Sequence, residues 1–132
     1  MSPQVYKIFE EICAQAAIRG AVLEVGAGPV PDCLLDLPAL RQASRRIGLN
    51  LEKHPAGAGY EIIQGNANDM SVFESGSFEA VICNATLEHD PFFWKSIAEI
   101  HRVTAPGGLI VIGVPGFCGM GVDHFAPRKS MV

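Results

Sequence analysis

The hydrophobic residues of this chain gather in five short apolar runs, and segments of mixed polarity separate them. The runs lie at about residues 21–25, 46–51, 60–63, 78–83 and 109–114. Short, nearly continuous apolar runs are typical of parallel strands covered on both faces, because neither face then meets water. The pattern therefore predicts five strands of a buried sheet.

Two of the remaining segments carry apolar residues at helical spacing. The first begins at the Ser-Pro pair of residues 2–3, a cap followed by proline at the first helical position, and Gly20 predicts its end. The second begins at the Asp-Pro pair of residues 90–91 and continues to about Val103, before residues 105–108 stop it. The residues expected to pack on the sheet are Val5, Ile8, Phe9, Ile12, Cys13 and Ala16 in the first helix, and Phe93, Ile97, Ile100 and Val103 in the second.

The other connections are less regular. Residues 31–44 contain four leucines with Pro38 among them, and a proline inside a helix removes a hydrogen bond, so two short helical pieces or one kinked helix are expected. Residues 72–76 are expected to form a brief helical or irregular piece.

Strands that alternate with helices imply right-handed crossovers, so the predicted fold class is α/β with a doubly wound parallel sheet. We expect a single domain over 1–132, with a helix at 1–20, a core at 21–115 and a tail at 116–132.

Composition narrows the class of protein. The chain has 132 residues, is 48% hydrophobic and has a formal net charge of −4, without a dense cluster of Lys and Arg that would indicate a nucleic-acid or membrane-surface partner. The four cysteines form no CxxC pair, so a disulfide framework or a metal site is not expected, and reduced thiols predict a cytoplasmic protein. Charged residues in the first helix argue against a signal peptide, and glycine and proline interrupt the longest apolar stretch, 109–122, which is not a membrane span.

Polar residues follow the apolar runs at their carboxyl ends. In doubly wound parallel sheets, ligands bind beyond these ends. Glycine tolerates left-handed backbone and carries no Cβ, so the turn after the first run lets a ligand approach the backbone and its free N–H groups. The residues at these ends are Glu24, Gly26, Ala27 and Gly28 after the first run, Asn50 after the second, Asn68 and Asp69 after the third, and Asn84, Glu88 and His89 after the fourth.

With these residues in place, the chain resembles the class I S-adenosylmethionine-dependent methyltransferases, in particular the small bacterial type with a Leu-Glu-His turn after the fourth strand. The resemblance covers about residues 20–115, and its motifs occur in family order. The motifs are VLEVGAG at 22–28, GLNLE at 48–52, GNANDM at 65–70, GSFEAVICNATLEH at 76–89 and EIHRVTAPGGLIVIGVP at 99–115. The resemblance implies a Rossmann-like sheet, S-adenosylmethionine as cofactor, and methyl transfer to an unidentified small-molecule or glycan-like acceptor.

The resemblance also assigns roles to the first two strand ends. Gly26, Ala27 and Gly28 would let the backbone approach the methionine part and the ribose, and Glu24 would hold the amino end of the methionine directly or through water. Asn50 stands where the family usually has an acid that accepts hydrogen bonds from both ribose hydroxyls. Period-two alternation would put Glu52 on the same side if the strand persists that far, so it is a candidate substitute.

Further roles fall on the later strand ends. Asn68, Asp69 and the Met70 backbone would hold or flank the adenine, and Asn84 with Ala85 would border the sulfonium. In-line methyl transfer needs mainly positioning, so a base is required only for a weakly nucleophilic acceptor, and His89 is the candidate. Glu88 is a less direct candidate, and Phe92, Phe93 and Trp94 either line an acceptor pocket or pack the second helix.

The sequence departs from the family pattern in three ways. Val30 replaces the third glycine, Asn50 replaces the acid, and the chain stops after the fifth of seven strands in the family order 3-2-1-4-5-7-6. The run at 109–114 would then form an uncovered sheet edge, through which a homo-oligomer is an expected option.

Two alternatives to an active methyltransferase remain open from the sequence. One is a truncated or degenerate domain of the same fold without independent activity. The other is an NAD-dependent oxidoreductase, although Pro31 stands where its third glycine is expected, and Glu24 and the Pro-Gly-Gly at 106–108 are untypical of that class.

Overall fold

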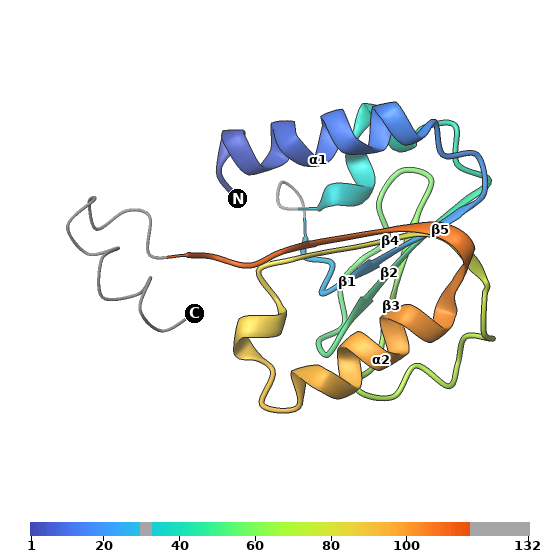
Figure 1. The fold of residues 1–132 in the computed structure, drawn as a ribbon. Helices are drawn as coiled ribbons and strands as arrows, with labels where there is room; N and C mark the ends of the chain where they lie inside the picture. Colours follow the sequence, from blue (N-terminus) through green and yellow to red (C-terminus); the bar gives the residue numbers. More distant parts are fainter. Residues whose placement is uncertain (30–32, 117–132) are drawn as a thin grey trace, which may run out of the picture.

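The computed structural model describes residues 1–29 and 33–116, and in these residues a central sheet is covered on both faces (Figure 1). Helix α1 (Pro3–Ala16) and two 3-10 segments cover one face, and helix α2 (Phe93–Val103) covers the other. None of the helices in the described ranges combines the length and apolarity needed to cross a membrane.

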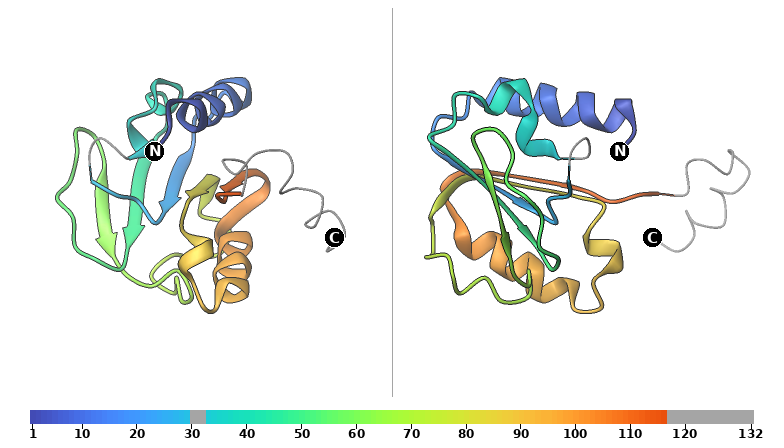
Figure 2. Two further views of the ribbon diagram at one scale, coloured as in Figure 1. Left: turned by 90° about the vertical axis from the view of Figure 1, so that its left-hand side faces the viewer. Right: turned by 180° about the vertical axis from the view of Figure 1, so that it is seen from behind.

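The sheet has five parallel strands in the order β3-β2-β1-β4-β5 (Figure 2). The strands are β1 (Ala21–Val25), β2 (Arg45–Asn50), β3 (Glu61–Gln64), β4 (Phe78–Asn84) and β5 (Thr104–Gly113). The predicted α/β fold is thereby confirmed, and the order equals the first five positions of the family sheet. Because all five strands are parallel, their carboxyl ends meet at one edge.

Strand alternation divides the core into two clusters. Val22 and Ile82 lie in the cluster under α1, whereas Leu23, Val25 and Val81 lie in the cluster under α2. The same alternation places the polar residues at the ends of β1, β2 and β4 on the α1 side of the sheet.

Helix α1 begins as predicted, because Ser2 caps it and Pro3 is its first residue. The prediction that Gly20 ends it is wrong: the helix ends at Ala16, and Ala17 is left-handed with φ 49°. The Ala17 N–H donates to the carbonyl oxygens of residues 13 and 14, so the helix closes without glycine. Ile8, expected on the packing face, is 53% exposed.

The segment before β2 is broken, as predicted. Two 3-10 turns, Leu34–Asp36 and Pro38–Leu40, replace a continuous helix, and Pro38 begins the second. The four leucines of this segment are fully buried in the cluster under α1. The expected helical start between the glycine turn and residue 33 includes residues 30–32, which lie outside the described ranges.

The predictions for α2 and β5 need three corrections. Helix α2 begins at Phe93 rather than at the Asp-Pro pair of residues 90–91. Ile100 and Val103 are buried as predicted, but Phe93 and Ile97 are exposed, and Ser96 is buried with the first two. The Pro-Gly-Gly of residues 106–108 lies inside β5 rather than before it, since β5 begins directly at Thr104. The register against β4 shifts between Phe78 and Ala80, and this irregularity accommodates a proline that cannot donate a ladder hydrogen bond.

Candidate functional site

A pocket of about 410 Å³ lies at the carboxyl ends of β1 to β4. Its walls come from the glycine turn, the end of β2, the loop after β3 and the segment that leads from β4 into α2. The described residues that line it are Gly26, Leu49, Asn50, Leu51, Gly65, Asn66, Ala67, Asn68, Ala85, Thr86, His89, Asp90, Pro91 and Phe92. A volume of this size is in the range of pockets that hold small molecules and cofactors.

The floor of the pocket at β1 is the glycine turn. Gly26 has a φ of +80°, and a Cβ at this residue would overlap Thr86 Oγ1 and lie 2.9 Å from Thr86 Cβ. Thr86 follows Ala85, itself left-handed with φ 54°. Glycine is therefore required at residue 26 by its own backbone and by the close approach of the chain after β4.

The glycine turn is bonded to the end of β2. The N–H groups of Gly26 and Ala27 both donate to Leu49 O, at 2.7 and 3.1 Å. In return, Asn50 Nδ2 donates to Ala27 O at 2.7 Å. Asn50 Oδ1 accepts from the Glu52 N–H at 2.8 Å. Asn50 lines the pocket, but its amide is already engaged at both ends.

Glu52 does not take the place of Asn50 in this structure. Strand β2 ends at Asn50, so the alternation that would bring Glu52 to the same side stops short of it. Glu52 is exposed and is not among the described residues that line the pocket.

The wall after β3 is fastened to the start of α2. Asn68 Nδ2 donates to Asp90 Oδ2 at 2.9 Å and to Ser96 Oγ at 2.8 Å, and Ser96 Oγ donates to Asp90 Oδ2 at 2.5 Å. Burial alone would raise the pKa of Asp90, but hydrogen bonds from Ser96, the Phe92 N–H and Asn68 together lower it. Asp90 is therefore a carboxylate at neutral pH, and it joins the two segments.

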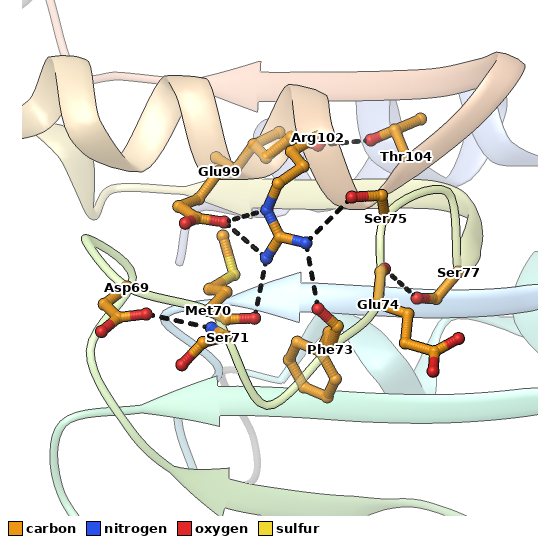
Figure 3. Close-up of polar contacts among 11 residues, drawn as sticks. Asp69, Met70, Ser71, Phe73, Glu74, Ser75, Ser77, Glu99, Arg102 and Thr104 are labelled. Atoms are coloured by element: carbon orange, nitrogen blue, oxygen red, sulfur yellow. Dashed lines mark hydrogen bonds and ion pairs between the residues drawn. The ribbon is translucent and has the colours of Figure 1, made fainter.

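Arg102 connects the loop after β3 to the other end of α2 (Figure 3). The guanidinium pairs with Glu99 at 2.7 Å and donates to the carbonyl oxygens of Met70 at 2.9 Å and Phe73 at 3.1 Å. It also donates to Ser75 Oγ at 3.2 Å. No sequence pattern indicates this role, although Arg102 lies in the motif EIHRVTAPGGLIVIGVP at 99–115.

Glu24 lies beside the pocket rather than in its lining. Its side chain is 3% exposed, and Oε1 accepts from Leu34 N at 2.9 Å, Leu35 N at 3.2 Å and Cys33 Sγ at 3.5 Å. Burial raises the pKa of Glu24 to about 7, and these three hydrogen bonds oppose the rise only in part. The carboxylate thus binds backbone N–H groups of the segment that follows the glycine turn.

Of the other predicted residues, His89 lies on the pocket rim with its side chain 82% exposed, 3.8 Å from Glu88. Phe92 lines the pocket, whereas Phe93 and Trp94 do not. The Asp69 carboxylate accepts from the Ser71 N–H at 3.1 Å, and the Asn84 side chain lies beside Gly113. The predicted residues that the structure brings to the pocket are Gly26, Asn50, Asn68, Ala85 and His89, and those outside its lining are Glu24, Ala27, Gly28, Asp69, Met70 and Asn84.

Cysteine and metal chemistry add little to this site. Cys13, Cys33 and Cys83 are buried free thiols, and burial raises the pKa of each to about 11 or 12, so they are poor nucleophiles. Cys118 lies outside the described residues. Within 1–29 and 33–116, His, Cys, Asp and Glu side chains form no group of three that could hold a metal ion.

A parallel sheet in this strand order, with a pocket at its carboxyl edge and a glycine turn as its floor, defines a Rossmann-like protein of the kind that binds a nucleoside cofactor. Residues 23–112 match the family model described as a methyltransferase domain, and the chain belongs to that family. S-adenosylmethionine is the cofactor that this family implies. No protein with a curated description matches the sequence significantly.

Solved structures share the fold at low sequence identity. A Methanococcus maripaludis protein, proposed to be an S-adenosyl-L-methionine-dependent methyltransferase, superposes with a TM-score of 0.68 and 19% identity over 84% of this chain and 56% of its own. An arsenic(III) S-adenosylmethionine methyltransferase from Chlamydomonas reinhardtii gives 0.60 and 22%, over 70% of this chain and 38% of its own. The trans-methyltransferase CalH, in complex with SAH, gives 0.54 and 17%, over 81% and 35%. The chain thus spans about half the length of these structures or less.

Proposed function

We propose that this chain binds S-adenosylmethionine in the pocket at the ends of β1 to β4 and acts as the cofactor-binding part of a methyltransferase for a small-molecule or glycan-like acceptor. The observation that carries the proposal is the coincidence of the pocket with the strand ends of a methyltransferase domain matched over 23–112. The family and the fold support the cofactor, and the acceptor class rests on the resemblance in the sequence.

The chemistry of the pocket fits this cofactor. Asn66, Asn68 and Thr86 line it with amide and hydroxyl groups, which suit a ribose and an adenine edge. The apolar side chains of Leu51 and Phe92 are 68% and 47% exposed and line the same pocket, so a planar base can cover them. Burying such surface on binding is favourable in proportion to the apolar area covered.

The bound cofactor would supply a methyl group on a sulfonium, which leaves as a neutral thioether. The residues of this chain would act by orienting the cofactor, because displacement with a good leaving group depends mainly on alignment. His89 is the side chain on the rim that could accept a proton from an alcohol or phenol acceptor. Its exposure suits an acceptor that approaches from solvent.

A second function is favoured by one observation. The Asn50 amide is engaged at both ends, so the ribose contact that the family usually makes with an acid is weakened here. A domain that keeps the fold but has no independent activity is therefore the alternative.

Isothermal titration with S-adenosylhomocysteine tests the proposal, because this product of methyl transfer binds without turnover. We expect F92A to weaken the affinity about tenfold, since Phe92 lines the pocket. F93A is the matched control, because Phe93 has the same 47% exposure outside the pocket lining, and its affinity should equal that of the wild type. Absence of binding heat from a folded wild-type sample would contradict the proposal.

A further inference from the structure

We propose that Asn50 is a positioning residue that holds the glycine turn against the end of β2, and that it does not replace the family acid as the acceptor for the ribose diol. The proposal depends on the proposed function only for the identity of the ligand. The connection between the two segments is a property of the chain without ligand.

A closed set of hydrogen bonds joins residues 26–27 to residues 49–50. Gly26 and Ala27 donate their N–H groups to Leu49 O, and Asn50 Nδ2 returns a bond to Ala27 O at 2.7 Å. The other end of the amide accepts from the Glu52 N–H at 2.8 Å, so the side chain also fixes the turn that follows β2. One side chain therefore connects the glycine turn with the end of the neighbouring strand and the start of its loop.

The orientation of the amide follows from its partners. A backbone carbonyl needs a donor and a backbone N–H needs an acceptor, so Nδ2 must face Ala27 and Oδ1 must face Glu52. An amide is the smallest side chain that offers both groups at this spacing. An ionised carboxylate offers two acceptors, and one of its oxygens would face Ala27 O without a proton between them.

These two hydrogen bonds use most of the hydrogen-bonding capacity of the Asn50 side chain, so little of it remains for a ribose. After its two internal bonds, the amide retains one N–H and one lone pair, whereas a free carboxylate accepts from both hydroxyls of a diol. Asn50 nevertheless lines the pocket, so the turn that it holds forms part of the wall. Its contribution to binding then comes mainly from the shape of the glycine turn.

The variant N50D separates the two roles, because it restores the family acid and removes the donor to Ala27. For a positioning role, we expect the amide protons of Gly26 and Ala27 to exchange about tenfold faster in N50D than in the wild type at pH 8, measured by NMR without ligand. In N50D, the Ala27 carbonyl oxygen faces the new carboxyl group and favours its protonated form. The excess of the exchange rate over that of the wild type should therefore shrink as the pH falls toward 5.

Ligand affinity gives the second readout. We expect N50D to bind S-adenosylhomocysteine about tenfold more weakly than the wild type at pH 8, with the deficit decreasing at pH 5. The matched control is Q64E, because Gln64 Nε2 also donates to a backbone carbonyl, Leu51 O at 3.1 Å, but lies at an exposed site outside the pocket lining. Q64E adds the same charge near the same edge and should change the affinity less than twofold.

N50A keeps the proposal testable if N50D does not fold. It removes both hydrogen bonds without adding charge, so the Glu52 N–H loses its acceptor directly. The N–H groups of Gly26 and Ala27, which donate to Leu49 O, should lose protection through the released turn, and in both places the loss relative to the wild type should not depend on pH. Tighter ligand binding by N50D with unchanged amide exchange would overturn the proposal. Faster exchange in both variants, with no binding to the wild type, would support the positioning role and contradict the proposed function instead.

Discussion

At the scale of single residues, a buried carboxylate contributes to the pH dependence of folding. Glu24 has an ordinary pKa of 4.5 when the chain is unfolded, and burial raises its pKa to about 7 in the folded chain. The folded state therefore binds more protons than the unfolded state between these values, so the free energy of unfolding falls as the pH rises from 4.5 to 7. The difference amounts to about 3 kcal/mol.

The first prediction follows for E24Q. The amide can still accept from the N–H groups of Leu34 and Leu35, but it carries no buried charge. We expect E24Q to unfold with a free energy up to about 3 kcal/mol above that of the wild type at pH 8, and with little difference near pH 4.5. Urea unfolding at several pH values measures this. A difference between the two proteins that stays constant with pH would show that Glu24 does not titrate as described.

The second prediction concerns Gly26, whose conformation and surroundings both exclude a side chain. G26A should lose at least about 2 kcal/mol more of unfolding free energy than G107A. Gly107 is the matched control because its φ is +76° and a Cβ there meets nothing within 4 Å, so it reports the backbone strain alone. Thermal and urea unfolding of both variants give the comparison. Equal losses would mean that Thr86 moves aside at little cost.

At the scale of elements, helix α2 and the loop after β3 behave as one unit. Arg102 donates to two carbonyl oxygens of that loop from one end of the helix, and Asp90 accepts from Asn68 just before its start. Arg102 therefore holds a wall of the pocket from outside the pocket lining, whereas Asp90 and Asn68 are part of the lining.

The third prediction is that R102A lowers the unfolding free energy by about 2 kcal/mol, because it leaves the Met70 and Phe73 carbonyl oxygens without their donor. Hydrogen exchange in residues 70–76 should rise with it. R45A is the control, since the Arg45–Glu61 pair is exposed on both sides and should contribute no more than about 0.5 kcal/mol. Equal effects of the two variants would show that Arg102 does not stabilise the contact between α2 and the loop after β3.

The helices and strands were largely predictable from the sequence, whereas the long-range side-chain contacts were not. Apolar runs located the first four strands within one residue, because a buried strand needs continuous hydrophobicity, whereas β5 begins five residues before the run at 109–114. Helix ends were less predictable: Ala17 closes α1 in a conformation that glycine usually adopts, and Pro106 lies within β5. Long-range polar contacts such as Arg102 to Met70 have no local pattern, so the sequence could not indicate them.

At the scale of the whole molecule, the two edges of the sheet differ. Strand β3 forms one edge; it is four residues long and carries exposed Glu61 and Gln64, which discourage pairing with another chain. Strand β5 forms the other edge, with ten residues and exposed Ile110 and Ile112. The sequence predicted this uncovered edge from the family strand order, which no local pattern could have supplied.

The fourth prediction is that the 132-residue chain self-associates through β5. Strand β5 pairs with β4 on one side, and on its other side no strand of the described residues pairs with it. This edge offers backbone donors and acceptors beside apolar side chains, so edge-to-edge pairing should be favourable at micromolar concentrations. Sedimentation should then show a mass that rises with concentration. I112K should lower this association at least about threefold, because a lysine on the edge must be desolvated when strands pair. I8K is the control, since Ile8 is equally apolar and 53% exposed on α1, away from the edge. A concentration-independent monomer, or equal effects of I112K and I8K, would exclude β5 as the site of association.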